Sequence, residues 1–274
     1  MTPEIAAAVA AGADRGEAPE VAMRHHLLEG LLRRLAASSV VEDFVVRGGL
    51  VTRMWAPGRA TRDLDLVGDH TFDLEATSER LRTIGRVPVD DGLRIDPLAV
   101  RTQGIWLHTD FPGVRAHIPV TFGTTVLRVT ADVGFGDPLV PAATWVDYPA
   151  LVGPPPRVRA CAPECQVSWK LHGLAENEAR FRPKDLADLA RILAHQTLDA
   201  ARMPAAIEAA FISRGFTVHQ ARTILDAPFW ASGRARARWR EAEAPGQLAP
   251  TLQAVRTALQ PFLDALPDSP DPSG

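Results

Sequence analysis

Lysine is almost absent from this sequence: of its 30 basic residues only Lys170 and Lys184 are lysines, and all the others are arginines. A coding preference for arginine explains that background, yet these two positions have kept lysine. Lysine carries a compact point charge that suits a phosphate oxygen, whereas arginine presents a wide planar fork. The two lysines are therefore either accidents of composition or candidate phosphate-binding residues.

Cysteine and long apolar runs are also scarce. Cys161 and Cys165 are the only cysteines, and because structural zinc normally takes four ligands, we expect free thiols. No apolar run approaches the roughly 18 residues that a membrane span needs. The first residues, MTPEIAAAVAAGADRGEAPE, lack the basic start and apolar core of a signal peptide. We therefore expect a cytoplasmic protein without a membrane partner. Its net charge of −3 neither requires nor excludes a nucleic acid.

Hydrophobic periodicity divides the chain into a mixed half and a helical half. Helical spacing over 20–38 and 72–84 alternates with strand patterns at 44–46, 63–67 and 93–134. The proline-rich stretch LVGPPPRVRACAPE indicates a connector, and the segments beyond it have helical patterns. We predict an α/β lobe over 1–150, an all-α lobe over 151–265 and a disordered tail over 266–274.

The stretch ATRDLDLVGD contains two aspartates, Asp63 and Asp65, that alternate with Leu64 and Leu66. In a strand the two carboxylates lie on one face and the two leucines on the other. Neighbouring carboxylates repel each other unless a cation compensates them, and Mg²⁺ is often held by one or two carboxylates plus phosphate. An edge strand with a solvated outer face would explain the same pattern.

Two further features favour the metal site. Asp132 closes a later strand, and three carboxylates from neighbouring strands are what two Mg²⁺ ions need in a phosphoryl transfer. Gly48 and Gly49 end one strand where a helix is predicted to begin. Glycine lets the backbone approach a phosphate, and a helix N-terminus presents free N–H groups to it. Three aspartates alone would also fit a metal-dependent phosphodiesterase, but the glycine pair favours binding of a triphosphate.

The succession of a glycine pair, a helix, R-x-T-x-D-x-D-L and a later strand carboxylate resembles the DNA polymerase β-type nucleotidyltransferase superfamily. More narrowly, it resembles the AbiEii-type (MenT-like) nucleotidyltransferase toxins of bacterial abortive-infection and toxin–antitoxin systems. The matching stretches are VVRGGLVTRMW, RATRDLDLV, PGVRAHIPVTFGTTVLRVTADVGFGDPL and WKLHGLAENEARFRPKDLADLARIL. The resemblance covers about residues 20 to 265. It implies a polymerase β-like α/β (α+β) lobe with a mixed sheet, followed by an all-α C-terminal lobe that completes the active site.

The resemblance also implies roles for individual residues. Those expected to act in catalysis are Asp63, Asp65, Asp132, Lys170 and Asp185, the three strand aspartates as ligands of two Mg²⁺ ions. Those expected to contact the nucleoside triphosphate are Gly48, Gly49, Arg53, Arg59 and Lys184. Both lysines of the chain thus fall in the motif. Asp188, three residues beyond Asp185, could share its helix face or be a solvated surface acid.

The implied activity is the transfer of a nucleoside monophosphate from a triphosphate to an acceptor hydroxyl, with a tRNA 3′ end as the expected acceptor and a cognate antitoxin as partner. A hydroxyl of a protein or small molecule is an alternative acceptor, and a catalytically silent nucleotide-binding protein is a third hypothesis. Arg234, Arg236, Arg238 and Arg240, beside Trp239, could bind RNA phosphates or form a solvated face. Arg62, like Arg59, could contact the triphosphate or form surface ion pairs, and His172 is expected to be a packed histidine.

Overall fold

The computed structural model describes residues 2–56, 58–176, 182–242, 244 and 246–267. It divides the chain into two compact units, Met1–Asp137 with Ala143–Cys161, and Pro138–Ala142 with Ala162–Gly274. The sequence predicted the division at residue 150. It falls after Cys161 because the segment RVRA, which we interpreted as part of an aperiodic connector, is a strand of the first unit's sheet.

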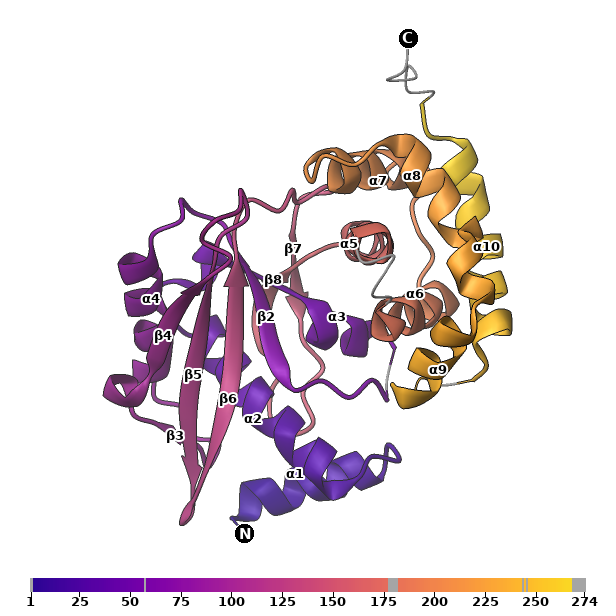
Figure 1. The fold of residues 1–274 in the computed structure, drawn as a ribbon. Coiled ribbons are helices and arrows are strands. Elements are labelled where there is room, and N and C mark those ends of the chain that lie inside the picture. Colours follow the sequence, from indigo (N-terminus) through magenta and orange to yellow (C-terminus); the bar gives the residue numbers. More distant parts are fainter. Residues whose placement is uncertain (1, 57, 177–181, 243, 245, 268–274) are drawn as a thin grey trace. The chain divides into compact units, whose positions relative to one another are not determined.

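The first unit is one mixed eight-stranded sheet with helices (Figure 1). Its helical elements are α1 Pro3–Ala13, α2 Pro19–Ala36, η1 Val41–Asp43, α3 Gly48–Trp55, α4 Leu74–Arg86 and η2 Pro97–Ala99. Its strands are β1 Phe44–Arg47, β2 Asp63–Gly68, β3 Arg94–Ile95, β4 Arg101–Ile105, β5 Gly113–Phe122, β6 Thr125–Gly134, β7 Thr144–Asp147 and β8 Arg157–Ala160. The strand order is β3-β5-β6-β2-β1-β8-β7, and β4 also pairs with β5. The strand β6 therefore lies between β5 and β2 and is hydrogen-bonded to both.

The two faces of this sheet differ in chemistry. On one face Leu64 and Leu66 of β2 are buried, as the alternation predicted, and Val46 of β1 is the register partner of Leu66. Helix α4 packs against β5 and α2 packs against β8; Figure 1 shows α4 beside β4 at the left-hand edge of the sheet. The other face carries Asp63 and Asp65. Burying the leucines thus turns the two aspartates away from the apolar core.

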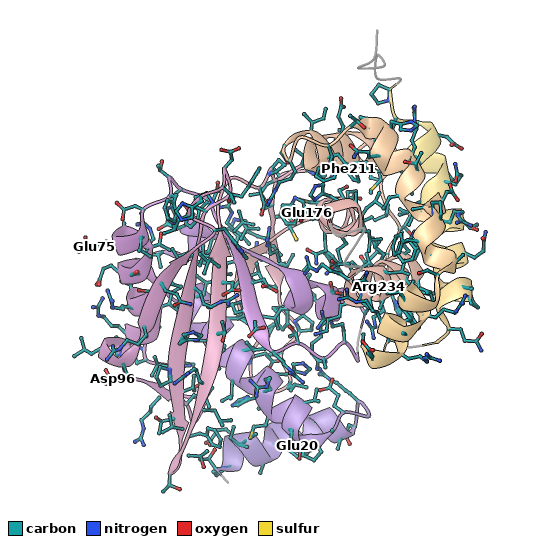
Figure 2. The ribbon with its side chains drawn as sticks, viewed as in Figure 1. Glu20, Glu75, Asp96, Glu176, Phe211 and Arg234 are labelled. Carbon is teal, nitrogen blue, oxygen red and sulfur yellow. The ribbon has the colours of Figure 1, made fainter. Side chains whose placement is uncertain are left out.

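The described residues of the second unit form helices joined by loops, without a strand. Its elements are α5 Pro163–Glu176, α6 Pro183–His195, α7 Met203–Ile212, α8 Val218–Thr223, η4 Ile224–Asp226, η5 Pro228–Ala231, α9 Gly233–Glu241 and α10 Leu248–Asp264. Helix α5 packs against α6 and α7, and α10 packs against α6. The ring of His172 lies edge-on to Phe211, labelled in Figure 2, and to Phe216, so the prediction of a packed histidine is confirmed.

Three smaller expectations can be compared with the structure. Cys161 and Cys165 are free and buried, as predicted. The predicted tail began at residue 266, but Leu266 is buried and its carbonyl accepts a hydrogen bond from Arg222. The residues 268–274 lie outside the described part of the chain. Within the described residues, no helix combines the length and apolarity that crossing a membrane requires.

A buried carboxylic acid connects α2 to the segment before β8. Glu29 is only 1% exposed, and one of its oxygens accepts the backbone N–H of Leu151 at 2.9 Å. Burial raises the pKa of Glu29 from 4.5 to about 7, because a buried carboxylate loses hydration that a neutral acid needs less. Between these two pKa values the folded protein binds a proton that the unfolded chain does not.

Stability should therefore fall as pH rises from 4.5 to 7 through this one group. We expect Glu29→Gln, which keeps the shape without the charge, to gain stability relative to the parent over that window, by on the order of 3 kcal/mol in total. Urea unfolding followed by circular dichroism between pH 5 and 8 measures the difference. Glu20→Gln is the control, since Glu20 is exposed on α2 (Figure 2). An identical pH slope in Glu29→Gln and parent would contradict this assignment.

Candidate active site

The turn from β1 into α3 brings backbone against a carboxylate. Gly48 begins α3 with φ +69°, and a Cβ at this position would lie 2.2 Å from Oδ2 of Asp65. A Cβ on Gly49 would lie 2.2 Å from Oγ1 of Thr61 and 3.4 Å from Nη1 of Arg59. The turn thus places Gly48 beside Asp65, and Gly49 beside Thr61 and Arg59, at the first N–H groups of α3. The binding of a phosphate at this turn stays a prediction.

Two of the three predicted carboxylates are neighbours across the sheet. Asp65 and Asp132 are register partners in the parallel pair of β2 and β6, so their side chains lie side by side on one face. Asp63 lies on the same face, two residues earlier and exposed, with Thr130 as its register partner. The structure therefore places all three aspartates on the predicted face, with Asp65 and Asp132 as the close pair.

Arginines flank this pair on both sides. Arg115 of β5 is the register partner of Asp132 and donates to both of its oxygens, Nε to Oδ1 at 2.8 Å and Nη2 to Oδ2 at 2.6 Å. Arg47 of β1 is the register partner of Asp65 and donates to Asp137. Four adjacent strands thus carry one row of charges, Arg115, Asp132, Asp65 and Arg47, which we call the charged row.

The aspartates of the charged row raise the pKa values of its two arginines. The hydrogen bonds to Asp132 raise the pKa of Arg115, and the charges of Asp63 and Asp65 raise it further. Burial by itself lowers the pKa of Arg47. The negative charges of Asp137 and Asp65 have the larger effect, so the pKa of Arg47 is raised above its ordinary value. The permanent positive charges of Arg115 and Arg47 therefore offset the repulsion between the neighbouring carboxylates of the row.

The donor set suits a divalent cation of the magnesium type. Among the described residues no three His, Cys, Asp or Glu side chains converge closely enough to form a complete metal site. Asp132 is engaged by Arg115, and the expected three-carboxylate site for two ions stays a prediction. Mg²⁺, however, is usually held by only one or two carboxylates and completes its shell with phosphate and water. Asp65 with either neighbouring aspartate, beside a helix N-terminus, fits that requirement.

Other predicted triphosphate ligands are placed differently. Arg53 was expected to contact the triphosphate, but it is buried, and its guanidinium binds Glu17 in the interior. It is therefore not positioned to bind a substrate. Arg62 is exposed beside Asp63. Lys184 is exposed on the first turn of α6 and belongs to the second unit.

A buried relay that the sequence did not reveal supports the loop before β2. The N–H of Thr61 donates to Nε2 of His25 at 3.4 Å, and Nδ1 of His25 lies 3.1 Å from Glu17, which also accepts from Arg53. Burial, aided by the charge of Arg53, lowers the pKa of His25 to about 4. The ring is therefore neutral at physiological pH, with Nε2 as acceptor and the proton on Nδ1. The first two helices thus hold Thr61 against Gly49.

In the second unit, Lys170 lies between two carboxylates. Its Nζ is 3.0 Å from Oδ1 of Asp185 and 2.9 Å from Oδ2 of Asp188. Asp188 is fully buried and also pairs with Arg191, so it is not a solvated surface acid. Burial opposes the charge of Lys170, but Asp185 and Asp188 raise its pKa above the ordinary value. The lysine is therefore charged and joins α5 to α6.

The basic helix α9 presents its charges but not its aromatic ring. Arg234, labelled in Figure 2, Arg236 and Arg240 are exposed. Trp239 is 3% exposed and donates its indole N–H to the carbonyl of Gly246. The tryptophan packs into the unit, so any contact with nucleic acid would come from the arginines, without base stacking on this ring.

Comparison with known protein families decides the class. Residues 30–261 match the family model described as the nucleotidyl transferase AbiEii toxin of type IV toxin–antitoxin systems. The chain belongs to the AbiEii family. The general enzyme class is therefore that of a nucleotidyltransferase, and membership implies an antitoxin partner. Glu17 and His25 of the buried relay precede the matched segment.

Two solved structures from Helicobacter pylori are similar to this chain. One, assigned as a nucleotidyltransferase, has 12% identity and a TM-score of 0.42, covering 91% of this chain and 97% of its own. The other, JHP933, has 13% identity and a TM-score of 0.42, covering 91% of this chain and 94% of its own. A search of curated proteins found no significant match.

The contact between Gly48 and Asp65 can be tested by adding one methyl group. Gly48→Ala should destabilise the protein by about 2–5 kcal/mol, because it combines an unfavourable left-handed backbone with a clash against Asp65. Gly16→Ala is a matched control, since Gly16 has φ +75° and open space around its Cβ position. The control should lose only about 1–2 kcal/mol in urea unfolding. Equal losses in the two variants would show that the clash is relieved.

The two lysines form a natural comparison of buried and exposed charge. Lys170→Met leaves Asp185 and Asp188 without their shared cation and should cost about 3–5 kcal/mol of stability. Lys184→Met removes an exposed lysine and should change stability by less than about 0.5 kcal/mol. Thermal and urea unfolding of the two variants provide the measurement. A Lys170→Met protein as stable as its parent would mean that this ion pair is energetically unimportant.

Proposed function

We propose that this AbiEii-family protein transfers a nucleoside monophosphate from a nucleoside triphosphate to an acceptor hydroxyl, with Mg²⁺ bound at the aspartates of β2 and β6. The observation that carries the proposal is the pairing of Asp65 with Asp132 directly beside the Gly48 turn. An acidic pair next to the N-terminus of a helix is suited to a metal that carries phosphates.

The chemistry assigns separate tasks to the residues. The acceptor oxygen bonds to the α-phosphorus while the bond from that phosphorus to the bridging oxygen breaks; pyrophosphate leaves and the hydroxyl proton passes to solvent. Bound Mg²⁺ would supply neutralisation of the charge that develops on the phosphate oxygens. Gly48 and Gly49 would orient the triphosphate by their N–H groups, and Arg59 would add a fixed positive charge. These contacts pre-position the α-phosphorus for attack.

The ligands of this metal would be Asp65 with either Asp63 or Asp132, on the shared face of the sheet. Asp63 is exposed and therefore accessible to an ion that arrives with its nucleotide. We assign Lys170 and Asp185 to the same reaction, as the family resemblance implies. Lys170 pairs with both Asp185 and Asp188, and these two contacts would keep its positive charge in a fixed position.

For the acceptor we propose the 3′ end of tRNA. The exposed arginines Arg234, Arg236 and Arg240 on α9 support a polyanionic acceptor, because arginine side chains neutralise nucleic acid phosphates. In this role the protein would act as a toxin by blocking the end at which tRNA is charged, and the antitoxin of the system would counter it. We expect the protein to act in the cytoplasm.

The direct test is a transfer assay with purified protein, Mg²⁺, each of four labelled nucleoside triphosphates and total tRNA. We expect label on RNA with at least one nucleotide, and a loss of at least about 100-fold in Asp65→Asn, which removes a fixed charge from the site. Asp69→Asn, just beyond the end of β2, is the control and should retain activity. Parallel reactions with total protein and with small alcohols identify other acceptors. Label on protein only, or no transfer at all, would refute the tRNA assignment.

A further inference from the structure

Arg115 occupies the carboxylate that the proposed metal needs. Its two hydrogen bonds engage both oxygens of Asp132, and each is within 2.8 Å. Asp63 and Asp65 also act on its charge, so the guanidinium lies in the combined field of the three aspartates. Arg115 is therefore a cation bound directly to the acidic face of the sheet.

A guanidinium and a divalent cation compete for the same carboxylate. Mg²⁺ binds a carboxylate oxygen directly at about 2.1 Å and requires near-ideal geometry. A bidentate arginine occupies one lone pair on each oxygen and presents its own positive charge where the ion would approach. Metal binding at Asp132 is therefore weaker while Arg115 stays bound to both oxygens.

The surroundings of the pair allow such a release. The side chain of Arg115 is 38% exposed, whereas that of Asp132 is 17% exposed. A partly exposed ion pair contributes little to the stability of a fold, so opening it does not disturb the sheet. Once released, a guanidinium on this face can bind phosphate oxygens with the same planar fork.

We propose that Arg115 is an internal counter-cation that competes with the divalent metal for Asp132 and passes to the phosphates of the nucleotide when the metal enters. The inference rests on the proposed function of this site and adds a residue to it. Its consequence is coupling: metal alone binds weakly because it competes with Arg115, whereas metal with nucleotide gives the released guanidinium a new partner.

Manganese binding by the full-length protein, in the absence of nucleotide, tests the competition. Free Mn²⁺ is measured by electron paramagnetic resonance during titration of the parent, Arg115→Gln and the double variant Arg115→Gln/Asp132→Asn. We expect Arg115→Gln to bind Mn²⁺ about tenfold more tightly than the parent, within the usual range of coupling between two sites. The gain should disappear in the double variant, because it arises at Asp132.

Two further variants make the result specific. Arg128→Gln, on the same face of β6, removes an exposed arginine and should leave the Mn²⁺ affinity at the parent's value. Arg115→Lys keeps a positive charge without the planar fork and should bind Mn²⁺ with intermediate affinity, which covers the case in which Arg115→Gln folds poorly. Thermal unfolding gives an independent readout: Mn²⁺ should raise the Tm of Arg115→Gln more than that of the parent.

Each outcome decides the proposal. Unchanged or weaker Mn²⁺ binding in both Arg115→Gln and Arg115→Lys would overturn it, as would a gain that persists without Asp132. These measurements use no catalytic turnover. A parent protein that shows no nucleotide transfer would therefore refute the proposed function and leave the competition between Arg115 and metal as a separate, measured result.

Discussion

The candidate site depends on one constraint, the position of β6 between β5 and β2. That strand order makes Asp132 a neighbour of Asp65 on one side and of Arg115 on the other. Arg47 completes the row from β1. A sheet face can carry two adjacent carboxylates only when cations compensate their repulsion, and here the cations come from the outer strands of the same row. The strand register that brings the two aspartates together therefore also places the arginines that compensate their charges.

A second layer of polar residues holds the backbone near that row. The relay from Glu17 through His25 to Thr61 is buried, so its hydrogen bonds exchange little with water and orient the loop before β2. Arg53 of α3 donates a hydrogen bond to Glu17 of this relay, and α3 is also the helix that begins with the glycine pair. The N-terminal helices, part of which precede the family match, thus contribute to the geometry of a site made of family motifs.

Local patterns predicted the elements well and the connector poorly. The alternation of Asp63, Leu64, Asp65 and Leu66 predicted a strand with one apolar face, and the structure confirms it because both leucines are buried. The segment RVRA has too few residues to show a period, and it becomes β8 only by pairing with β1 and β7. Arg53 looked like an exposed phosphate ligand in the sequence, yet its partner Glu17 lies 36 positions away and draws it inward.

By itself the sequence determined which residues can carry the chemistry: the acid pair on one strand face, the glycine pair at a helix start, and the lysines of the helical half, along with membership of the AbiEii family. Local periodicity and motif spacing suffice for this, since both are properties of neighbouring residues. Only the tertiary structure decided that Arg115 binds Asp132, that His25 supports Thr61 and that Asp188 is buried with Lys170. Those contacts join distant residues, and cross-strand register and helix packing exist only once the chain has folded.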